Sequence, residues 1–251
     1  MEKYLSINQS GCSVRCKLYC HDPARIKNVI IFGHGFAGHK DNGYAQLLAE
    51  RIMKKHRDTA LIVFNWPCHG DDARGRLCFD DCMAYLGLVI RYATERLKAE
   101  KLYACATSFG GYLFLRYLAG QEAPFERVVL RCPAVDMYDV LTGRIMSDAD
   151  KIAIAKGKPI LIGFDRKVRV TRDFLNELER SDITVNDYTA LADRILILHG
   201  TRDEIVPYEV VERFADSNGI SLVSFEGGDH RFTDPNKRDI AISRTIDFLQ
   251  L

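Results

Sequence analysis

Short apolar segments that alternate with helix-forming stretches constrain the fold of this chain more than any other feature. The apolar segments are rich in Val, Ile, Leu and Phe and are only about six residues long, which is typical of strands buried on both faces of a sheet. They cover residues 28–32, 59–64, 101–106, 127–131, 194–199 and 220–225. Helices are predicted at residues 44–55, 79–99, 110–119, 207–217 and 235–249. This alternation predicts an α/β fold with a mostly parallel central sheet and helices on both faces.

Two segments depart from this alternation. Residues 12–20 alternate apolar and polar side chains, and together with residues 5–7 they predict a hairpin at the edge of the sheet. Residues 136–190 contain no clear strand–helix–strand unit, so we expect a small inserted cap there, with residues 158–164 and 167–170 paired as a hairpin. The chain then divides into a first part of the core, the cap and a second part of the core, at residues 1–135, 136–190 and 191–251.

Composition narrows the classes of partner. The chain has 251 residues and a net charge of +1, so it lacks the basic field expected of a nucleic-acid-binding protein. No apolar run approaches the roughly 18–20 residues that cross a bilayer, and residues 1–8 lack the apolar core of a signal peptide. We therefore expect a cytoplasmic protein that binds neither nucleic acid nor membranes, and the sequence leaves a homodimer open.

The eight cysteines show no C-x-x-C pair and no second half with metal-ligand spacing. In a reducing compartment such cysteines are small buried apolar residues more often than they are ligands. We expect no bound metal and no cofactor.

One serine stands where a predicted strand meets a predicted helix. Residues 101–106 are β-prone and residues 112–118 continue well as a helix, with Ser108 between them. Small residues two positions before and after it, Ala106 and Gly110, permit the tight turn of a nucleophile elbow, which holds the serine Oγ clear of the backbone. The alternative is an ordinary strand-to-helix loop, because the usual elbow has Gly where Ala106 stands.

Other polar residues also directly follow predicted strands. In an open α/β sheet, ligands bind beyond the carboxyl ends of the strands, so residues in these positions can meet. Asp203 follows the strand at 194–199, and His230 follows the strand at 220–225. Ser108, Asp203 and His230 therefore fall on one rim of the sheet, in the chain order Ser, Asp, His.

These residue types suit nucleophilic catalysis. A serine hydroxyl needs a base at neutral pH, and His230 can take its proton while Asp203 orients the imidazole. The carbonyl under attack develops negative charge, which the backbone N–H groups of Phe36 and Phe109 can stabilise as an oxyanion hole. Phe36 lies in the glycine-rich loop after the first buried strand, and Phe109 directly follows the nucleophile.

Five residues are candidates for the same or neighbouring roles. Asp136 is the strongest rival for the acid position, whereas Asp229 is a poor one because adjacent side chains diverge. His34 and His199 stand beside glycines at strand ends, where a histidine more often satisfies backbone groups than performs chemistry. His69 is expected to pack within its loop.

With these residues in place, the chain resembles the α/β-hydrolase superfamily along nearly its full length. The segments that carry the resemblance are an oxyanion loop, a nucleophile elbow, an acid-bearing loop and a histidine loop, at residues 34–36, 106–111, 199–207 and 227–232. Within the superfamily, the His-Gly-Phe loop followed by residues 38–41, and the compact insertion, are similar to bacterial cinnamoyl (feruloyl) esterases. The resemblance implies an α/β-hydrolase fold and a serine esterase.

We therefore expect a serine hydrolase that cleaves carboxylic esters through an acyl-enzyme intermediate, with a small-molecule ester as its substrate. The acyl group is expected to be small and aromatic, such as hydroxycinnamoyl, or a short to medium aliphatic chain. An aminopeptidase, a thioesterase or a carbon–carbon bond hydrolase would use the same triad, because specificity resides in the pocket and cap. A hydrolase-fold protein that binds ligands without turnover is a further alternative.

Overall fold

Eight strands form one sheet at the centre of the computed structural model, which describes residues 1–9, 11–72, 75–120, 123–164 and 166–251. Their spatial order is β1-β2-β4-β3-β5-β6-β9-β10. The bounds are β1 (Glu2–Gln9), β2 (Cys12–Tyr19), β3 (Asn28–Gly33), β4 (Thr59–Phe64), β5 (Lys101–Thr107), β6 (Phe125–Arg131), β9 (Ile195–Gly200) and β10 (Ser221–Phe225). The strand pairs β1/β2 and β2/β4 are antiparallel and the other neighbours are parallel. This confirms the predicted α/β fold and the edge hairpin.

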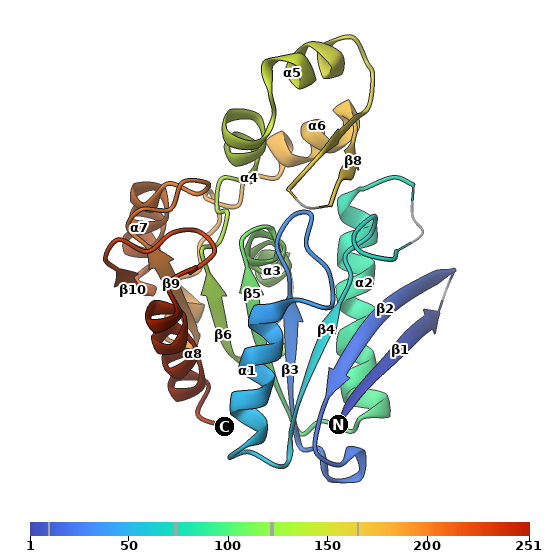
Figure 1. Cartoon of the computed structure of the whole chain (residues 1–251), viewed down its shortest axis with the longest axis vertical. Coiled ribbons are helices and arrows are strands. Elements are labelled where there is room, and N and C mark those ends of the chain that lie inside the picture. The colour runs from blue at the N-terminus through green and yellow to red at the C-terminus, as the bar shows by residue number, and fades with distance from the viewer. Residues whose placement is uncertain (10, 73–74, 121–122, 165) are drawn as a thin grey trace.

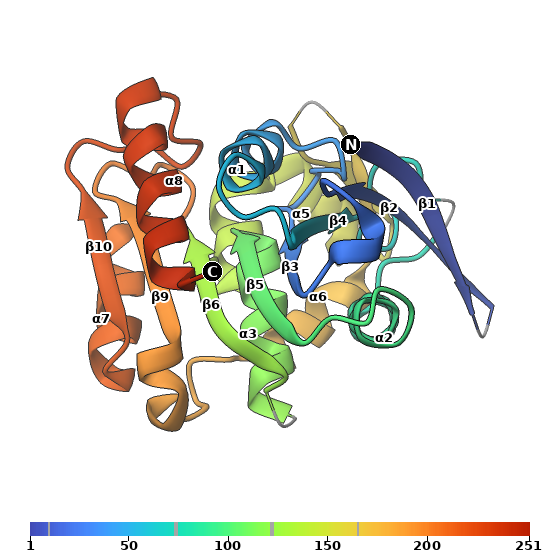
Figure 2. The same ribbon diagram turned by 90° about the horizontal axis from the view of Figure 1, so that it is seen from below.

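Helices cover both faces of the sheet (Figure 2). One face carries α1 (Gly43–Met53) and α8 (Pro235–Leu249), and the other carries α2 (Phe79–Arg91), α3 (Phe109–Gly120) and α7 (Tyr208–Asn218). Successive strand side chains point to opposite faces, so a doubly covered strand needs an apolar residue at every position. In β3, Ile30 and Phe32 join the apolar cluster of α1 and α8, whereas Val29 and Ile31 join the cluster of α2 and α3.

The predicted helix at residues 79–99 is wrong at its carboxyl end. The α-helix ends at Arg91 and continues as one π-helical turn, η2 (Tyr92–Arg96). Leu97 N donates to Tyr92 O at 3.1 Å, and Lys98 has a positive φ of 57°. The Thr94 hydroxyl donates to two preceding carbonyls, a competition that often bends helices.

The segment between β6 and β9 lies above the carboxyl ends of the strands (Figure 1). It contains short elements: α4 (Met137–Asp139), η3 (Val140–Ile145), α5 (Asp148–Ala155), β7 (Ile160–Ile162), β8 (Val168–Val170), α6 (Arg172–Arg180) and η4 (Thr189–Arg194). Strands β7 and β8 pair antiparallel, which confirms the hairpin expected there. Helix α6 buries Phe174, Leu175 and Leu178, and the Phe174 ring lies 6.3 Å from that of Phe109. This packing places the segment directly over the start of α3.

The described residues contain neither a membrane-spanning helix nor a disulfide. No helix among them combines the length and the apolar character that crossing a membrane requires. None of the cysteines forms a disulfide in the described chain, and Cys16, Cys20, Cys82, Cys105 and Cys132 are buried. A short 3₁₀ turn, η1 (Pro23–Arg25), leads into β3.

Candidate active site

Ser108 occupies the turn between β5 and α3 and has a positive φ of 53°. Such a backbone conformation in a residue other than glycine costs about 1–3 kcal/mol and clusters at functional sites. The turn is held by hydrogen bonds from Ser108 N to Arg131 O, at 3.0 Å, and from Ala134 N to Ser108 O, at 3.2 Å. The end of the neighbouring strand β6 and the residues that follow it therefore hold the serine in its strained position.

Small residues around the turn are required by close backbone contacts. A Cβ added at Gly110 would lie 2.7 Å from His34 O and would also clash with Gly33, because α3 begins directly against the end of β3. A Cβ at Gly35 would lie 3.2 Å from the Ser108 Cβ. Ala106 is buried and its methyl group fits where the usual elbow has Gly. Alanine at that position is therefore compatible with the elbow.

Asp203 and His230 lie together at the carboxyl ends of β9 and β10. His230 Nδ1 is 2.8 Å from Asp203 Oδ2. The other carboxylate oxygen, Oδ1, accepts the backbone N–H groups of Ile205 at 2.9 Å and Val206 at 2.8 Å. The carboxylate is fully buried, so these bonds fix both its position and the orientation of the imidazole.

His199 adds a second imidazole to the same carboxylate. Its Nε2 lies 3.2 Å from Asp203 Oδ2 and 3.0 Å from Val206 O, so this histidine also meets a backbone group, as expected. Burial alone would raise the pKa of Asp203, but the hydrogen bonds from His199 and His230 more than offset this and hold the pKa well below its usual value. Asp203 is therefore ionised at neutral pH.

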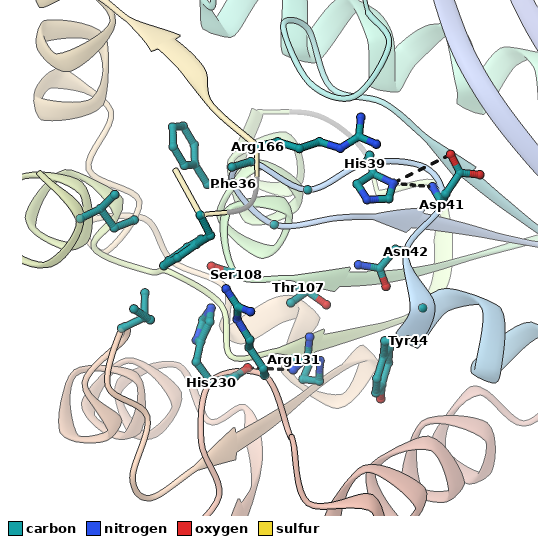
Figure 3. A pocket seen from close by; sticks show the side chains of 18 of the residues that line it. Phe36, His39, Asp41, Asn42, Tyr44, Thr107, Ser108, Arg131, Arg166 and His230 are labelled. Atoms are coloured by element: carbon teal, nitrogen blue, oxygen red, sulfur yellow. Dashed lines mark hydrogen bonds and ion pairs between the residues drawn. The ribbon is translucent and has the colours of Figure 1, made fainter. Parts of the chain in front are cut away.

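Ser108 and His230 line one pocket of about 340 Å³, and the imidazole lies beside the serine in Figure 3. No hydrogen bond joins the two side chains within the described residues. In unliganded sites such bonds are often long and shorten only with substrate. The structure thus brings together all three residues predicted as nucleophile, acid and base.

The two predicted oxyanion donors, Phe36 and Phe109, both lie near the serine. Phe109 begins α3, where the first N–H groups have no intrahelical acceptor. Phe36 lies in the loop after β3 and lines the same pocket as Ser108. The two rings meet edge to face with centroids 5.8 Å apart. The Phe109 ring also stacks on His69, with centroids 5.9 Å apart, which links the elbow to the loop after β4.

The competing residues have other partners. Asp229 accepts from the backbone and hydroxyl of Thr233, and Asp136 caps α4 by accepting from Asp139 N. His34 Nδ1 contacts Gly35 O at 2.8 Å and its Nε2 accepts from Trp66 N. His69 Nδ1 contacts Pro67 O at 2.8 Å, and burial lowers its pKa to about 4, so it stays neutral.

Sequence reasoning missed two residues beside the triad. Arg131 ends β6, and its Nη1 donates to the backbone oxygen of His230 at 2.9 Å. Its position as a charged residue at the carboxyl end of an apolar strand is a signal that could have identified it. Cys132 has a positive φ of 46° and is fully buried.

Cys132, Asp203 and His230 are the one group of three metal-ligand types brought together in the described chain, with ligand atoms within 4.8 Å of one another. Burial raises the pKa of the Cys132 thiol well above its ordinary value, so it is a poor source of the thiolate that a metal would need. The histidine nitrogen and the carboxylate oxygen of this group are already hydrogen-bonded to each other. The cluster therefore fits a triad better than a metal site.

Comparison with known proteins gives one family. Residues 64–251 match the model of the prolyl oligopeptidase family, Peptidase_S9. This segment contains Ser108, Asp203 and His230 but begins after the loop that contains Phe36. No curated protein sequence matches the chain.

Several solved structures have the same fold at low sequence identity. Est1E from Butyrivibrio proteoclasticus with ferulic acid bound has a TM-score of 0.75 and 18% identity, covering 98% of this chain and 100% of that chain. Mouse alpha/beta hydrolase domain-containing protein 10 has a TM-score of 0.73 and 16% identity, covering 99% and 98%. The esterase domain of a Rhodothermus marinus protein has a TM-score of 0.69 and 16% identity, covering 100% and 98%. These similarities show the α/β-hydrolase fold.

Proposed function

The chain belongs to the prolyl oligopeptidase family of α/β serine hydrolases, and we propose that it cleaves carboxylic esters through an acyl-enzyme intermediate. The observation that carries the proposal is the 2.8 Å contact of His230 with a buried, ionised Asp203, next to a serine on a strained elbow. Ser108, Asp203 and His230 are far apart in sequence, so only the folded core brings them together.

In the proposed mechanism, the Ser108 Oγ attacks the ester carbonyl carbon while His230 Nε2 takes the hydroxyl proton. The carbonyl oxygen becomes an oxyanion, which the N–H groups of Phe36 and Phe109 stabilise. The bond to the alcohol oxygen then breaks, and His230 returns the proton to that oxygen. Water repeats the sequence on the acyl-enzyme and releases the acid. Throughout, Asp203 accepts the hydrogen bond from Nδ1–H and stabilises the imidazolium.

The lining of the pocket favours an ester with a small aromatic or short to medium acyl group. We propose that residues 136–190 form a cap, whose Met137, Ile145 and Phe164 line the pocket together with Ile205. Apolar walls and a volume of about 340 Å³ suit a group of this size. The similar fold of Est1E, whose structure holds ferulic acid, supports a hydroxycinnamoyl ester as one candidate.

Cleavage of a peptide or aminoacyl amide is the second candidate. The match to the prolyl oligopeptidase family over residues 64–251 favours it. The same triad would act on either bond, and the leaving group would be an amine in place of an alcohol. The two candidates therefore differ in substrate and not in the catalytic residues.

Covalent labelling followed by competing substrates tests this proposal. A fluorophosphonate probe should label the peptide that contains Ser108 and should fail to label Ser108→Ala, whereas Ser221→Ala, exposed on β10, serves as the labelled control. The protein should hydrolyse p-nitrophenyl butyrate and methyl ferulate faster than alanine or proline p-nitroanilide. Faster anilide cleavage would favour the peptidase, and an unchanged ester rate in Ser108→Ala would refute the mechanism.

A further inference from the structure

The pocket that contains Ser108 has a second, polar end. Asn42, Tyr44, Thr107 and Arg131 line this end. Figure 3 shows them grouped on one side of the pocket, with Arg166 on the opposite side. The serine mechanism described above needs none of these four residues, so their arrangement indicates a second role for this end of the pocket.

Arg131 is a buried charge without a counter-charge. Arg131 is only 7% exposed, and its guanidinium makes no ion pair with a carboxylate of the described residues. Nη1 donates to His230 O, but the buried Nε has no hydrogen-bond partner. The rings of Tyr44 and Phe232 flank the guanidinium at 4.6 and 5.4 Å and hold it in place without a negative charge. Buried charges in proteins are ordinarily paired.

Two neighbouring side chains add further donors. Thr107 lies directly opposite Arg131 in the pairing of β5 with β6, and its buried hydroxyl has no partner. Asn42 uses its Oδ1 to accept from Ala45 N at 3.0 Å, where it caps α1, and this leaves its amide hydrogens for the pocket. A guanidinium, a hydroxyl and an amide NH2 together can donate to an acceptor with two oxygens.

The other charged residues of the pocket also favour a negatively charged ligand. Arg166 and Arg231 also line it, and neither forms an ion pair within the part of the chain that the structure describes. Asp41 lines it too, but its carboxylate accepts from Tyr4 at 2.7 Å and lies 3.4 Å from the Lys40 Nζ. The pocket therefore carries uncompensated positive charge, which attracts anions.

We propose that Arg131, Thr107 and Asn42 form a carboxylate subsite beside the nucleophile, so that the substrate carries a carboxylate in addition to the bond that is cleaved. A carboxylate matches the planar guanidinium in shape and supplies the missing counter-charge. The inference about substrates rests on the proposed hydrolase function, whereas binding of a carboxylate to the subsite does not.

Binding without turnover tests the subsite directly. Calorimetry on Ser108→Ala should show adipate binding at least about tenfold more tightly than adipamide, since hydrogen bonds to charged groups are about twice as strong as neutral ones. Adding Arg131→Met or Thr107→Val should remove most of this preference. Arg127→Met is the matched control, because Arg127 lies on the same strand and does not line the pocket. Equal binding of adipate and adipamide would overturn the proposal.

Turnover then shows where on the substrate the carboxylate lies. On the acyl side, monomethyl adipate is compared with methyl adipamate, and on the alcohol side 4-carboxyphenyl butyrate is compared with 4-carbamoylphenyl butyrate. For one pair, kcat/KM should favour the carboxylate by about 10–100-fold, and Arg131→Met should reduce that ratio towards one.

Failure of the subsite and failure of the proposed function give different results in these assays. If Arg131→Met lowers both members of each pair equally, Arg131 only positions the His230 loop and the subsite is refuted. If no ester is cleaved and no fluorophosphonate label appears, the proposed function fails, while calorimetry still decides whether the subsite exists.

Discussion

Replacing Asp203 with asparagine isolates the role of one buried charge. The substitution keeps the size of the side chain, and its Oδ1 can still accept the N–H groups of Ile205 and Val206. Its NH2 group would then replace the Oδ2 that contacts His230 Nδ1 at 2.8 Å. Two donors cannot face each other, so His230 must place its proton on Nε2, the nitrogen that has to accept the proton of Ser108.

The magnitude follows from this loss of the correct tautomer. In serine hydrolases with this triad, an acid-to-amide change lowers kcat by about 10⁴. That corresponds to about 5 kcal/mol of transition-state stabilisation. His199 contacts the same carboxylate oxygen at 3.2 Å, so it also faces the new NH2 group and cannot restore the lost acceptor.

Steady-state hydrolysis of p-nitrophenyl butyrate measures the effect. Asp229→Asn is the matched control, because Asp229 precedes His230 in sequence but accepts from Thr233, and it should stay within about threefold of wild type. Fluorophosphonate labelling of Asp203→Asn should slow in parallel with kcat. If Asp203→Asn keeps more than about a tenth of the wild-type kcat, the argument that Asp203 orients His230 is refuted.

Three further predictions concern stability and positioning. Gly110→Ala should lower the free energy of unfolding by about 2–3 kcal/mol, because the added Cβ would lie 2.7 Å from His34 O. Gly120→Ala in the same helix is the control, since its Cβ would meet nothing within 4 Å. Urea unfolding compares the two variants, and equal free energies of unfolding would contradict the steric argument. Burial lowers the pKa of His69 to about 4, below the unfolded value near 6.5. Between these pH values the folded chain then binds fewer protons than the unfolded chain. The free energy of unfolding should therefore fall by about 3 kcal/mol from pH 6.5 to pH 4. This dependence of the free energy of unfolding on pH should be smaller in His69→Gln. His199→Gln should lower kcat about tenfold with little change in KM, since it removes a contact to Asp203 and none to substrate; a change confined to KM would contradict this.

The sheet and the positions of Ser108, Asp203 and His230 at its rim could be predicted from sequence because each depends on a local pattern. The apolar runs of β3 and β4 are short and uninterrupted, and strand ends mark the positions where Ser108 and His230 stand. The elbow needs small residues at fixed offsets, and these are visible as Ala106 and Gly110. Such signals depend on nearest neighbours in sequence and on rules that hold for every parallel sheet.

The features that sequence reasoning missed depend on contacts between distant strands. In the sequence, Arg131 is only the last residue of a predicted strand. The register of β6 against β5 is what places it opposite Thr107. The sequence predicts that His199 bonds to the backbone, whereas its contact with Asp203 arises from the turn after β9. The π turn that follows α2 coincides with hydrogen bonds from the Thr94 hydroxyl to preceding carbonyls, which hydrophobic periodicity does not show.

The side chain of Phe109 has a consequence for how this protein can diversify. Its backbone N–H is proposed as an oxyanion donor, and its ring packs against His69 and against Phe174 of α6. A smaller residue at 109 would loosen the packing of the segment between β6 and β9, and a differently shaped one would displace the N–H itself. Changes in substrate range are therefore expected to arise in the segment between β6 and β9 around this ring, whereas position 109 itself is expected to tolerate little change.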